Sequence, residues 1–394
     1  MMSPFRAVVI TLLIVSSACG LANAAAARSP RAAKPATTAA PATKPMPFIR
    51  VAPDGAGFVR ESTNEKFTPW GLNYDRDHKL RLLEDYWDKE WSTVEADFRE
   101  MRLLGANVVR IHLQFGKFMN SPTEPNVENL QRLRKLVLFA ETQQLYLDIT
   151  GLGSYRKRDV PSWYNDLDEP SRWAAQANFW EAIAKTLADR PGVFCYDLVN
   201  EPVIPAEKVD AWLHPFALAS FHYVQHIVLD PADRDPDDIA RQWTQKMTAA
   251  IRKHDQRRPI TIGMLPIKPA DAEKSRGFVP RALKDDLDFI ALHLYPESKK
   301  LDDAMGTLKL FDVPNKPLVI EEIFPLSATP KELAAFIEQS RATADGWIGF
   351  YWGKTVDEME DDPGPFDKAM LAWLELFKKL NPATQPATKK TGKT

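Results

Sequence analysis

The sequence predicts an α/β protein folded as a closed (β/α)8 TIM barrel with a short N-terminal β-hairpin. Short apolar runs and amphipathic helical segments alternate eight times along one uninterrupted block of the chain. This alternation is typical of parallel strands joined by helical crossovers. A doubly wound open sheet is the alternative, but no G-x-G-x-x-G or P-loop motif follows any of the strands.

Eight apolar runs of strand length are the expected barrel strands. They are Phe67–Leu72, Val108–His112, Tyr146–Thr150, Val193–Val199, Ile260–Gly263, Phe289–Leu292, Leu318–Ile320 and Trp347–Tyr351. The segments between these runs have apolar residues three and four positions apart, which predicts amphipathic helices. Only the two helices on either side of the sixth strand look short. Before the first strand, Phe48–Val51 and Phe58–Glu61 flank a Gly-rich turn, which predicts the hairpin.

Composition favours one large domain. The 394 residues are 44% hydrophobic and 26% charged, enough for a single core. The net charge of −2 gives no basic surface for nucleic acid. Residues 25–47 are almost wholly Ala, Pro, Thr, Lys and Arg and predict a linker, and residues 381–394 predict a disordered tail of similar composition. The barrel domain is therefore expected over residues 48–380.

The N-terminus resembles a secretory signal peptide over residues 1–24. Arg6 precedes an apolar run, and Ala22-Asn23-Ala24 fits the small-x-small cleavage pattern, so export to the periplasm or the extracellular space is expected. A lipid anchor at Cys19 is the alternative. The run falls short of the ~20 residues that span a bilayer, so no membrane span is expected. Export would leave Cys195 as the only cysteine, a buried hydrophobe without a disulfide partner.

Two apolar strands end in carboxylates. The fourth reads V-F-C-Y-D-L-V-N-E-P and leaves Asn200 and Glu201 at its C-terminal end, while the seventh closes with Glu321 and Glu322. The C-terminal ends of barrel strands form the active-site face, and strands four and seven lie across it from each other. Facing carboxylates of this kind serve glycoside hydrolysis, in which one protonates the leaving oxygen and the other attacks the anomeric carbon.

The fourth strand is followed by a long connection from Val203 to about Pro236. His222 and His226 lie four residues apart in it, but Tyr223 stands where a zinc-protease helix needs glutamate. We therefore expect an amphipathic surface helix there. No metal and no cofactor are expected anywhere in the chain.

These residues resemble clan A of the glycoside hydrolases, and most closely family 5, the cellulase and mannanase family. The resemblance rests on Asn200-Glu201-Pro202 after the fourth strand and on V-I-E-E in the seventh. It implies that Glu201 is the general acid/base, Glu322 the nucleophile and Asn200 the donor to the sugar 2-hydroxyl. Strand parity lets only one of the two adjacent glutamates point inward. We favour Glu322, because the family usually places the nucleophile before an apolar or aromatic residue, although the glycine that follows there is missing here.

Further positions match the family across the barrel. In this resemblance Arg110 hydrogen-bonds the nucleophile, His293 and Tyr295 form the sixth-strand H-x-Y, and Trp352 is the platform that stacks on sugar. Gly71 and Asn73 resemble the opening of the first strand. His112 has the same parity as Arg110, which leaves it either as a polar contact in the pocket or as a packed histidine. The expected substrate-binding set is Asn200, Arg110, His293, Tyr295, Trp352, His112 and Asn73.

The function predicted from this pattern is an exported retaining glycoside hydrolase that cleaves β-linked, glucan- or mannan-like glycans by double displacement. Its partner is a carbohydrate substrate, and the sequence favours no particular oligomeric state. The alternative is a non-catalytic carbohydrate-binding barrel descended from such an enzyme. Two departures suggest that alternative: the irregular ending of the seventh strand, and Thr150-Gly151 where many family 5 cellulases have a third-strand histidine.

Overall fold

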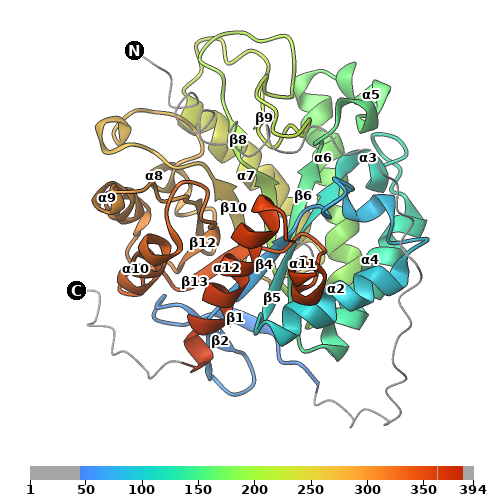
Figure 1. Ribbon diagram of the computed structural model, residues 1–394. Helices are drawn as coiled ribbons and strands as arrows, with labels where there is room; N and C mark the ends of the chain where they lie inside the picture. The colour runs from blue at the N-terminus through green and yellow to red at the C-terminus, as the bar shows by residue number, and fades with distance from the viewer. Residues whose placement is uncertain (1–44, 362, 385–394) are drawn as a thin grey trace.

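A computed structural model describes residues 45–361 and 363–384. Eight parallel strands close into a barrel in the order β10-β11-β12-β13-β4-β5-β6-β7, so the predicted fold is confirmed (Figure 1). Each expected run contains a strand, with small shifts at the ends. The barrel strands are β4 (Trp70–Tyr74), β5 (Val108–Gln114), β6 (Tyr146–Gly153), β7 (Val193–Asn200), β10 (Ile260–Met264), β11 (Ile290–His293), β12 (Leu318–Glu322) and β13 (Gly346–Phe350).

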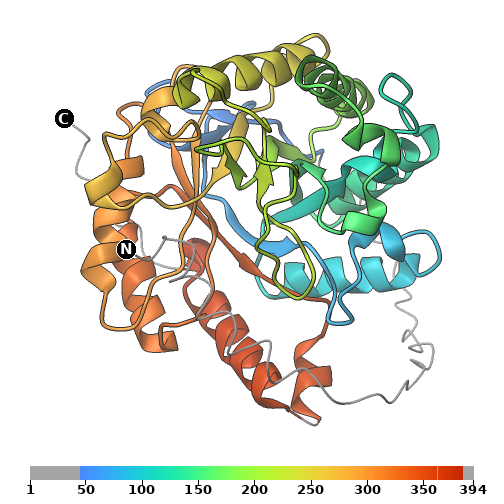
Figure 2. The same cartoon turned by 90° about the horizontal axis from the view of Figure 1, so that it is seen from above.

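Helices surround the barrel, as the view of Figure 2 shows. They bury the apolar stripes that the sequence predicts, and several begin at a capping side chain, such as Asn126 before α4 and Asp168 before α6. The helices are α2 (Trp91–Leu103), α3 (Phe115–Phe118), α4 (Val127–Thr142), α5 (Ser162–Asn165), α6 (Glu169–Leu187), α7 (Pro236–Arg252), α8 (Pro280–Leu283), α9 (Leu301–Phe311), α10 (Pro330–Ser340), α11 (Val356–Glu360) and α12 (Pro365–Lys379).

The two helices beside the sixth strand differ from each other. Helix α8 has four residues and is as short as predicted, whereas α9 has eleven, so its prediction as a short helix was wrong. Ala304, Leu308 and Phe311 form a regular buried stripe along α9. Polar residues between them hid this stripe in the sequence.

A small three-stranded sheet closes the N-terminal end of the barrel, at the bottom of Figure 1. Its strands are β1 (Ile49–Val51), β2 (Phe58–Arg60) and β3 (Lys66–Phe67), so the predicted hairpin gains a third strand. Phe58 packs edge-on against Phe194 in β7 and Phe289 just before β11, with ring centroids 5.0 and 5.2 Å away. Cys195 is buried in the same apolar cluster and is free, as predicted.

The long connection after β7 lies at the opposite end, at the top of Figure 1. The surface helix predicted around His222 and His226 is wrong, because this segment is irregular and forms only β8 (Pro202–Val203) and β9 (Gln225–His226). Its backbone bonds to a neighbouring loop instead: the amide of His222 donates at 2.7 Å to the carbonyl of Tyr155, which lies just after β6. These distant partners outweigh a weak local helical pattern.

The two ends of the chain fall mostly beyond the described residues. The predicted signal peptide and residues 25–44 of the predicted linker lie outside them, as do residues 385–394 of the predicted tail. Within the described part of that tail, Asn381 is buried and donates to the carbonyl of Gly105 at 2.8 Å. No helix in the described ranges is long and apolar enough to cross a membrane.

Candidate active site

Glu201 and Glu322 face each other at the C-terminal end of the barrel. Glu201 follows β7 with a positive φ of 47°, and its amide donates to the carbonyl of Gly263 at 2.9 Å. Such strained backbone in a non-glycine residue is frequent at active sites. Glu322 ends β12, and one oxygen of each carboxylate lies within 4.8 Å of the other. This close approach is typical of retaining glycosidases, whose carboxyl groups stand about 5 to 5.5 Å apart, rather than of inverting enzymes.

Two side chains hold the carboxylate of Glu322. Nη1 of Arg110 donates to Oε1 at 2.7 Å, and the hydroxyl of Tyr295 donates to Oε2 at 2.5 Å. Burial raises the pKa of Tyr295 well above its usual value, so the phenol keeps its proton as a donor. Together these bonds stabilise a negative charge on Glu322 and fix the direction of its oxygens.

Arg110 connects the site to the barrel interior. It is fully buried, and Nη2 donates to Asp197 at 2.7 Å and to Asn200 at 3.0 Å. Asn73 accepts from Nη1 at 2.9 Å and is itself fully buried. The amide of Asn73 donates to two carbonyls, those of Glu321 and Gly349. The structure thus brings Arg110 and Asn73, both predicted for the site, together: Arg110 bonds Glu322 and Asn200, and Asn73 bonds Arg110.

Asn200 is held from both sides. Its Oδ1 accepts from Arg110, and its Nδ2 donates to the carbonyl of Tyr223 at 3.2 Å. The carboxamide therefore has a fixed orientation beside Glu201, with its acceptor directed at the guanidinium. A polar group of this kind can hold a sugar hydroxyl only in one geometry.

His293 lies between the two carboxylates. Its Nδ1 is 2.9 Å from Oε1 of Glu201 and 3.5 Å from Oε2 of Glu322. Burial alone would lower the pKa of His293, but the charge of Glu322 and the bonds to Glu201 and Glu321 outweigh it and raise the pKa to about 10. Atoms of Glu201, His293 and Glu322 lie within 4.8 Å of one another. The short contact between His293 and Glu201 allows the imidazole to exchange a proton with that carboxyl group.

His112 belongs to a buried network one layer deeper. Its Nδ1 is 2.5 Å from the hydroxyl of Tyr155, and its Nε2 is 3.3 Å from Oδ1 of Asn73. Burial and the charges of Arg110 and His293 lower the pKa of His112 well below its usual value, so the ring is neutral. Of the two predictions for this residue, the packed histidine describes its surroundings in this structure.

Trp352 lies close to the site with its faces largely covered. The side chain is 9% exposed, its indole nitrogen donates to Asp75 at 2.9 Å, and the ring of Phe366 stacks on it at 5.4 Å. The guanidinium of Arg76 lies over the indole at 4.6 Å. Stacking on a sugar, as the resemblance implies, would require Arg76 or Phe366 to move aside.

Glu321 also points into the barrel, so the parity argument that allowed only one inward glutamate was wrong. The reason is a bulge between β11 and β12: Leu292 pairs with Ile320, whereas His293 pairs with Glu322. Glu321 is therefore the extra residue of the bulge, and both neighbours reach the interior. Glu321 is fully buried beneath Glu322.

Sequence reasoning missed Asp75 and Tyr223. The hydroxyl of Tyr223 donates to Oδ2 of Asp75 at 2.9 Å, while Oδ1 of Asp75 accepts from Trp352. Burial raises the pKa of Asp75 against the opposing effect of Arg76. The position of Asp75 just after the first strand was the available signal. No local pattern marked Tyr223, which approaches from the long connection.

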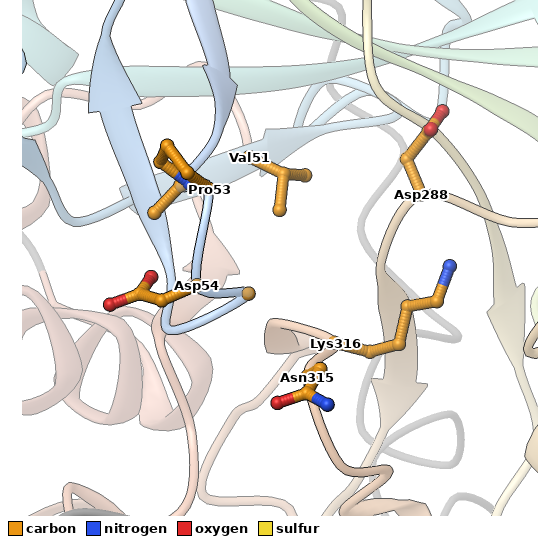
Figure 3. Close-up of a pocket in the computed structure, with 8 residues that line it drawn as sticks. Val51, Pro53, Asp54, Asp288, Asn315 and Lys316 are labelled. Atoms are coloured by element: carbon orange, nitrogen blue, oxygen red, sulfur yellow. The ribbon is translucent and has the colours of Figure 1, made fainter.

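One cavity lies away from these residues, at the N-terminal end of the barrel (Figure 3). It measures about 530 Å³ and is lined by the turn between β1 and β2 together with Asp288, Asn315 and Lys316. The three charged groups there are already engaged: Asp288 accepts from Arg252, Lys316 donates to the carbonyl of Leu287, and Asp54 accepts from the amide of Ala56 at 3.0 Å. With no paired acids and no orphaned charge in it, we do not place the substrate in this cavity.

A closed parallel barrel with two facing carboxylates at the C-terminal ends of its strands is the arrangement of a glycoside hydrolase. The chain belongs to the cellulase family, glycosyl hydrolase family 5, whose sequence model matches residues 64–355. The protein is therefore an O-glycosyl hydrolase of the retaining clan A. No match was found among curated proteins.

Several solved structures share the fold. The chain resembles the exo-β-1,4-mannosidase Op5Man5 from Opitutaceae bacterium strain TAV5 at 18% identity and a TM-score of 0.58, covering 84% of this chain and 62% of that one. A GH5_18 variant from Streptomyces cattleya in complex with Manβ1-4GlcNAc matches at 16% identity and a TM-score of 0.58, covering 81% of this chain and 83% of that one. The β-mannanase of the blue mussel Mytilus edulis matches at 14% identity and a TM-score of 0.57, covering 86% of this chain and 97% of that one.

Proposed function

We propose that this protein is an exported β-glycosidase that cleaves glycans by double displacement, with Glu322 as the nucleophile and Glu201 as the general acid/base. The approach of the two carboxylates to within 4.8 Å carries the proposal. Glu322 attacks the anomeric carbon while Glu201 protonates the departing oxygen. In the second step Glu201 removes a proton from water, which releases the sugar from Glu322.

The surrounding side chains fit these two roles. The nucleophile has to be a carboxylate, and Arg110 and Tyr295 direct a positive charge and a hydroxyl at its oxygens. Asn200 stands beside Glu201, where the family resemblance places the contact to the sugar 2-hydroxyl. We give Glu201 the proton-transfer role because the family resemblance places the acid/base at this position after Asn200, and because Arg110 and Tyr295 bond Glu322 instead.

We propose β-mannosides as the first substrate class, with β-glucans as the second. Structures of proteins named as mannosidases and mannanases share the fold of this chain, and one of them holds Manβ1-4GlcNAc. At their low identities this likeness shows the fold alone. It therefore sets the order in which substrates are tested.

We further propose attack at a chain end. Tyr223 bridges the ends of β7 and β4, since its carbonyl meets Asn200 at 3.2 Å and its hydroxyl meets Asp75 at 2.9 Å. Trp352, bonded to Asp75 and covered by Arg76, continues this wall. We propose that this wall, which lies beside the residue expected to hold the terminal sugar, limits that side of the scissile bond to one sugar.

Export remains part of the proposal and rests on the charge, apolar run and cleavage pattern of residues 1–24. We expect the full-length chain, expressed in a bacterial host, to be recovered from the periplasm or medium with residues 1–24 removed. Intact-mass measurement tests this. A mass increased by lipid at Cys19 would favour the anchored alternative, and an uncleaved cytoplasmic chain would contradict export.

The mechanism is tested by trapping the covalent intermediate. A 2-deoxy-2-fluoro-β-mannosyl fluoride, and its glucosyl counterpart, should inactivate the enzyme with time, and peptide mass spectrometry should find the sugar on Glu322. Labelling of Glu321 would overturn the assignment of the nucleophile. Sugar binding without hydrolysis of any β-mannoside, β-glucan, xylan or aryl glycoside would contradict turnover.

A further inference from the structure

We infer that Glu321 is a positioning residue of the reaction, because its buried carboxylate holds the imidazole of His293 in the doubly protonated form that donates to Glu201. The inference rests on the proposed roles of Glu201 and Glu322. Glu321 is fully buried and acts only through His293.

The geometry places Glu321 directly behind the histidine. Its Oε2 lies 3.6 Å from Nε2 of His293 and 3.7 Å from Nη2 of Arg110. Among the described residues, no hydrogen bond of ordinary length reaches either oxygen of Glu321 or Nε2 of His293. Arg110 already donates to Asp197 and Glu322 at 2.7 Å. The imidazole is therefore the cation whose second nitrogen faces Glu321 and has no closer partner.

The barrel backbone makes room for this pair. The bulge in β12 turns Glu321 inward. On the neighbouring β10, a Cβ on Gly263 would lie 2.5 Å from Nε2 of His293 and 2.9 Å from Oε2 of Glu321. Any larger residue at Gly263 would therefore push the two groups apart. Nη2 of Arg110 would lie 3.0 Å from the same Cβ, so the space that glycine leaves holds the side chains of His293, Glu321 and Arg110.

The other groups that face Glu321 leave it as the anion. Burial opposes its charge, but Arg110 and His293 outweigh burial and lower the pKa of Glu321. Asp148 takes the opposite form, because burial and the charge of Glu321 raise the pKa of Asp148 well above its usual value. The titratable and charged groups around Glu321 and His293 are Arg110, His112, Asp148, Cys195, Asp197, Glu201 and Glu322.

The charge state of His293 decides which way the proton of Glu201 can face. With a proton on each ring nitrogen, Nδ1 donates to Oε1 of Glu201, so the transferable proton has to sit on Oε2. A neutral ring with its proton on Nε2 would instead accept the Glu201 proton at Nδ1. Glu321 thus keeps the acid directed at the leaving oxygen, and the two imidazole protons stay in place throughout the cycle.

The test is Glu321→Gln, which keeps the shape and removes the charge. We expect the basic limb of the kcat/KM profile to move to lower pH by about one unit or more, with activity approaching that of the parent enzyme at acidic pH. A residue needed only for packing would lower activity at every pH without moving the limb. Glu84→Gln, another buried glutamate but outside the site, is the matched control and should leave the limb in place.

A second measurement does not depend on turnover. In ¹⁵N-histidine NMR spectra, with the signal assigned by loss in His293→Gln, the parent ring should stay doubly protonated between about pH 5 and 9. In Glu321→Gln it should lose a proton within that range. A neutral His293 in the parent protein at pH 7 would overturn the inference even if Glu321→Gln fails to fold. Inactivity of the parent enzyme on every glycoside would instead contradict the proposed function and leave this titration informative.

Discussion

Nη1 of Arg110 lies 2.7 Å from Oε1 of Glu322, although 212 positions separate the two residues in the sequence. The contact joins β5 to β12 across the barrel and places a buried cation beside the carboxylate of Glu322. The same guanidinium bonds Asp197 and Asn200. One side chain therefore supports both the active site and the fold.

Arg110→Met should destabilise the protein strongly. The change leaves Asp197, Glu321 and Glu322 buried without their shared cation, and breaking a buried pair costs about 3 to 5 kcal/mol. Urea unfolding measures the loss. Arg134→Met is the control, because its pair with Asp189 is exposed and should contribute about 1 kcal/mol or less. Equal losses in the two variants would contradict the central role of Arg110.

Glu201→Gln should slow hydrolysis by a factor that depends on the leaving group. General acid catalysis contributes about 10²- to 10⁴-fold, and a sugar leaving group needs it whereas a dinitrophenolate does not. We expect kcat/KM on oligosaccharides to fall by that factor. On dinitrophenyl glycosides, the rate of the first step, measured by stopped-flow, should fall only slightly. Glu322→Gln should abolish both reactions. Equal losses on both substrates in Glu201→Gln would contradict its role as the acid.

Tyr223→Ala should change where a chain is cut. Removing the ring and hydroxyl opens the wall between Asn200 and Asp75, so a longer stretch of sugar can pass beyond the scissile bond. On mannohexaose we expect the parent enzyme to release monosaccharide first and the variant to release longer products, as chromatography would show. Tyr223→Phe keeps the ring and should keep the monosaccharide pattern. Internal cleavage by the parent enzyme would contradict attack at a chain end.

The stability of the protein should depend on pH through Glu84. Burial raises the pKa of Glu84 to about 7, against the backbone bond that its oxygen accepts from Gln114 at 2.8 Å. A carboxyl whose folded pKa is raised favours folding most below its unfolded pKa near 4.5, and this stability is lost as the pH rises toward 7. The loss amounts to about 3 kcal/mol.

Glu84→Gln should remove that loss, because the amide does not ionise and its oxygen can still accept from Gln114. The free energy of unfolding of the variant minus that of the parent should therefore increase between about pH 4.5 and 7 and stay constant above it. Urea unfolding across this range measures the difference. A difference independent of pH would show that Glu84 does not titrate in the folded protein.

The sequence determined the barrel and the place of its chemistry. Strand and helix periodicities are local properties, so the eight strands could be located before any contact was known. Parallel strands in a closed barrel bring their C-terminal ends to one face. Asn200 and Glu201 therefore had to face the end of the seventh strand, and Arg110, His293 and Tyr295 gathered there for the same reason.

Only the tertiary structure decided what surrounds those groups. A single bulge in β12 turned Glu321 inward against strict alternation, and a backbone bond to the loop after β6 holds the His222 region in an irregular rather than a helical form. The covering of Trp352 by Arg76 and Phe366, and the bridge from Tyr223 to Asp75, join segments far apart in the chain. Such contacts depend on the packing of distant side chains, which no local pattern in the sequence encodes.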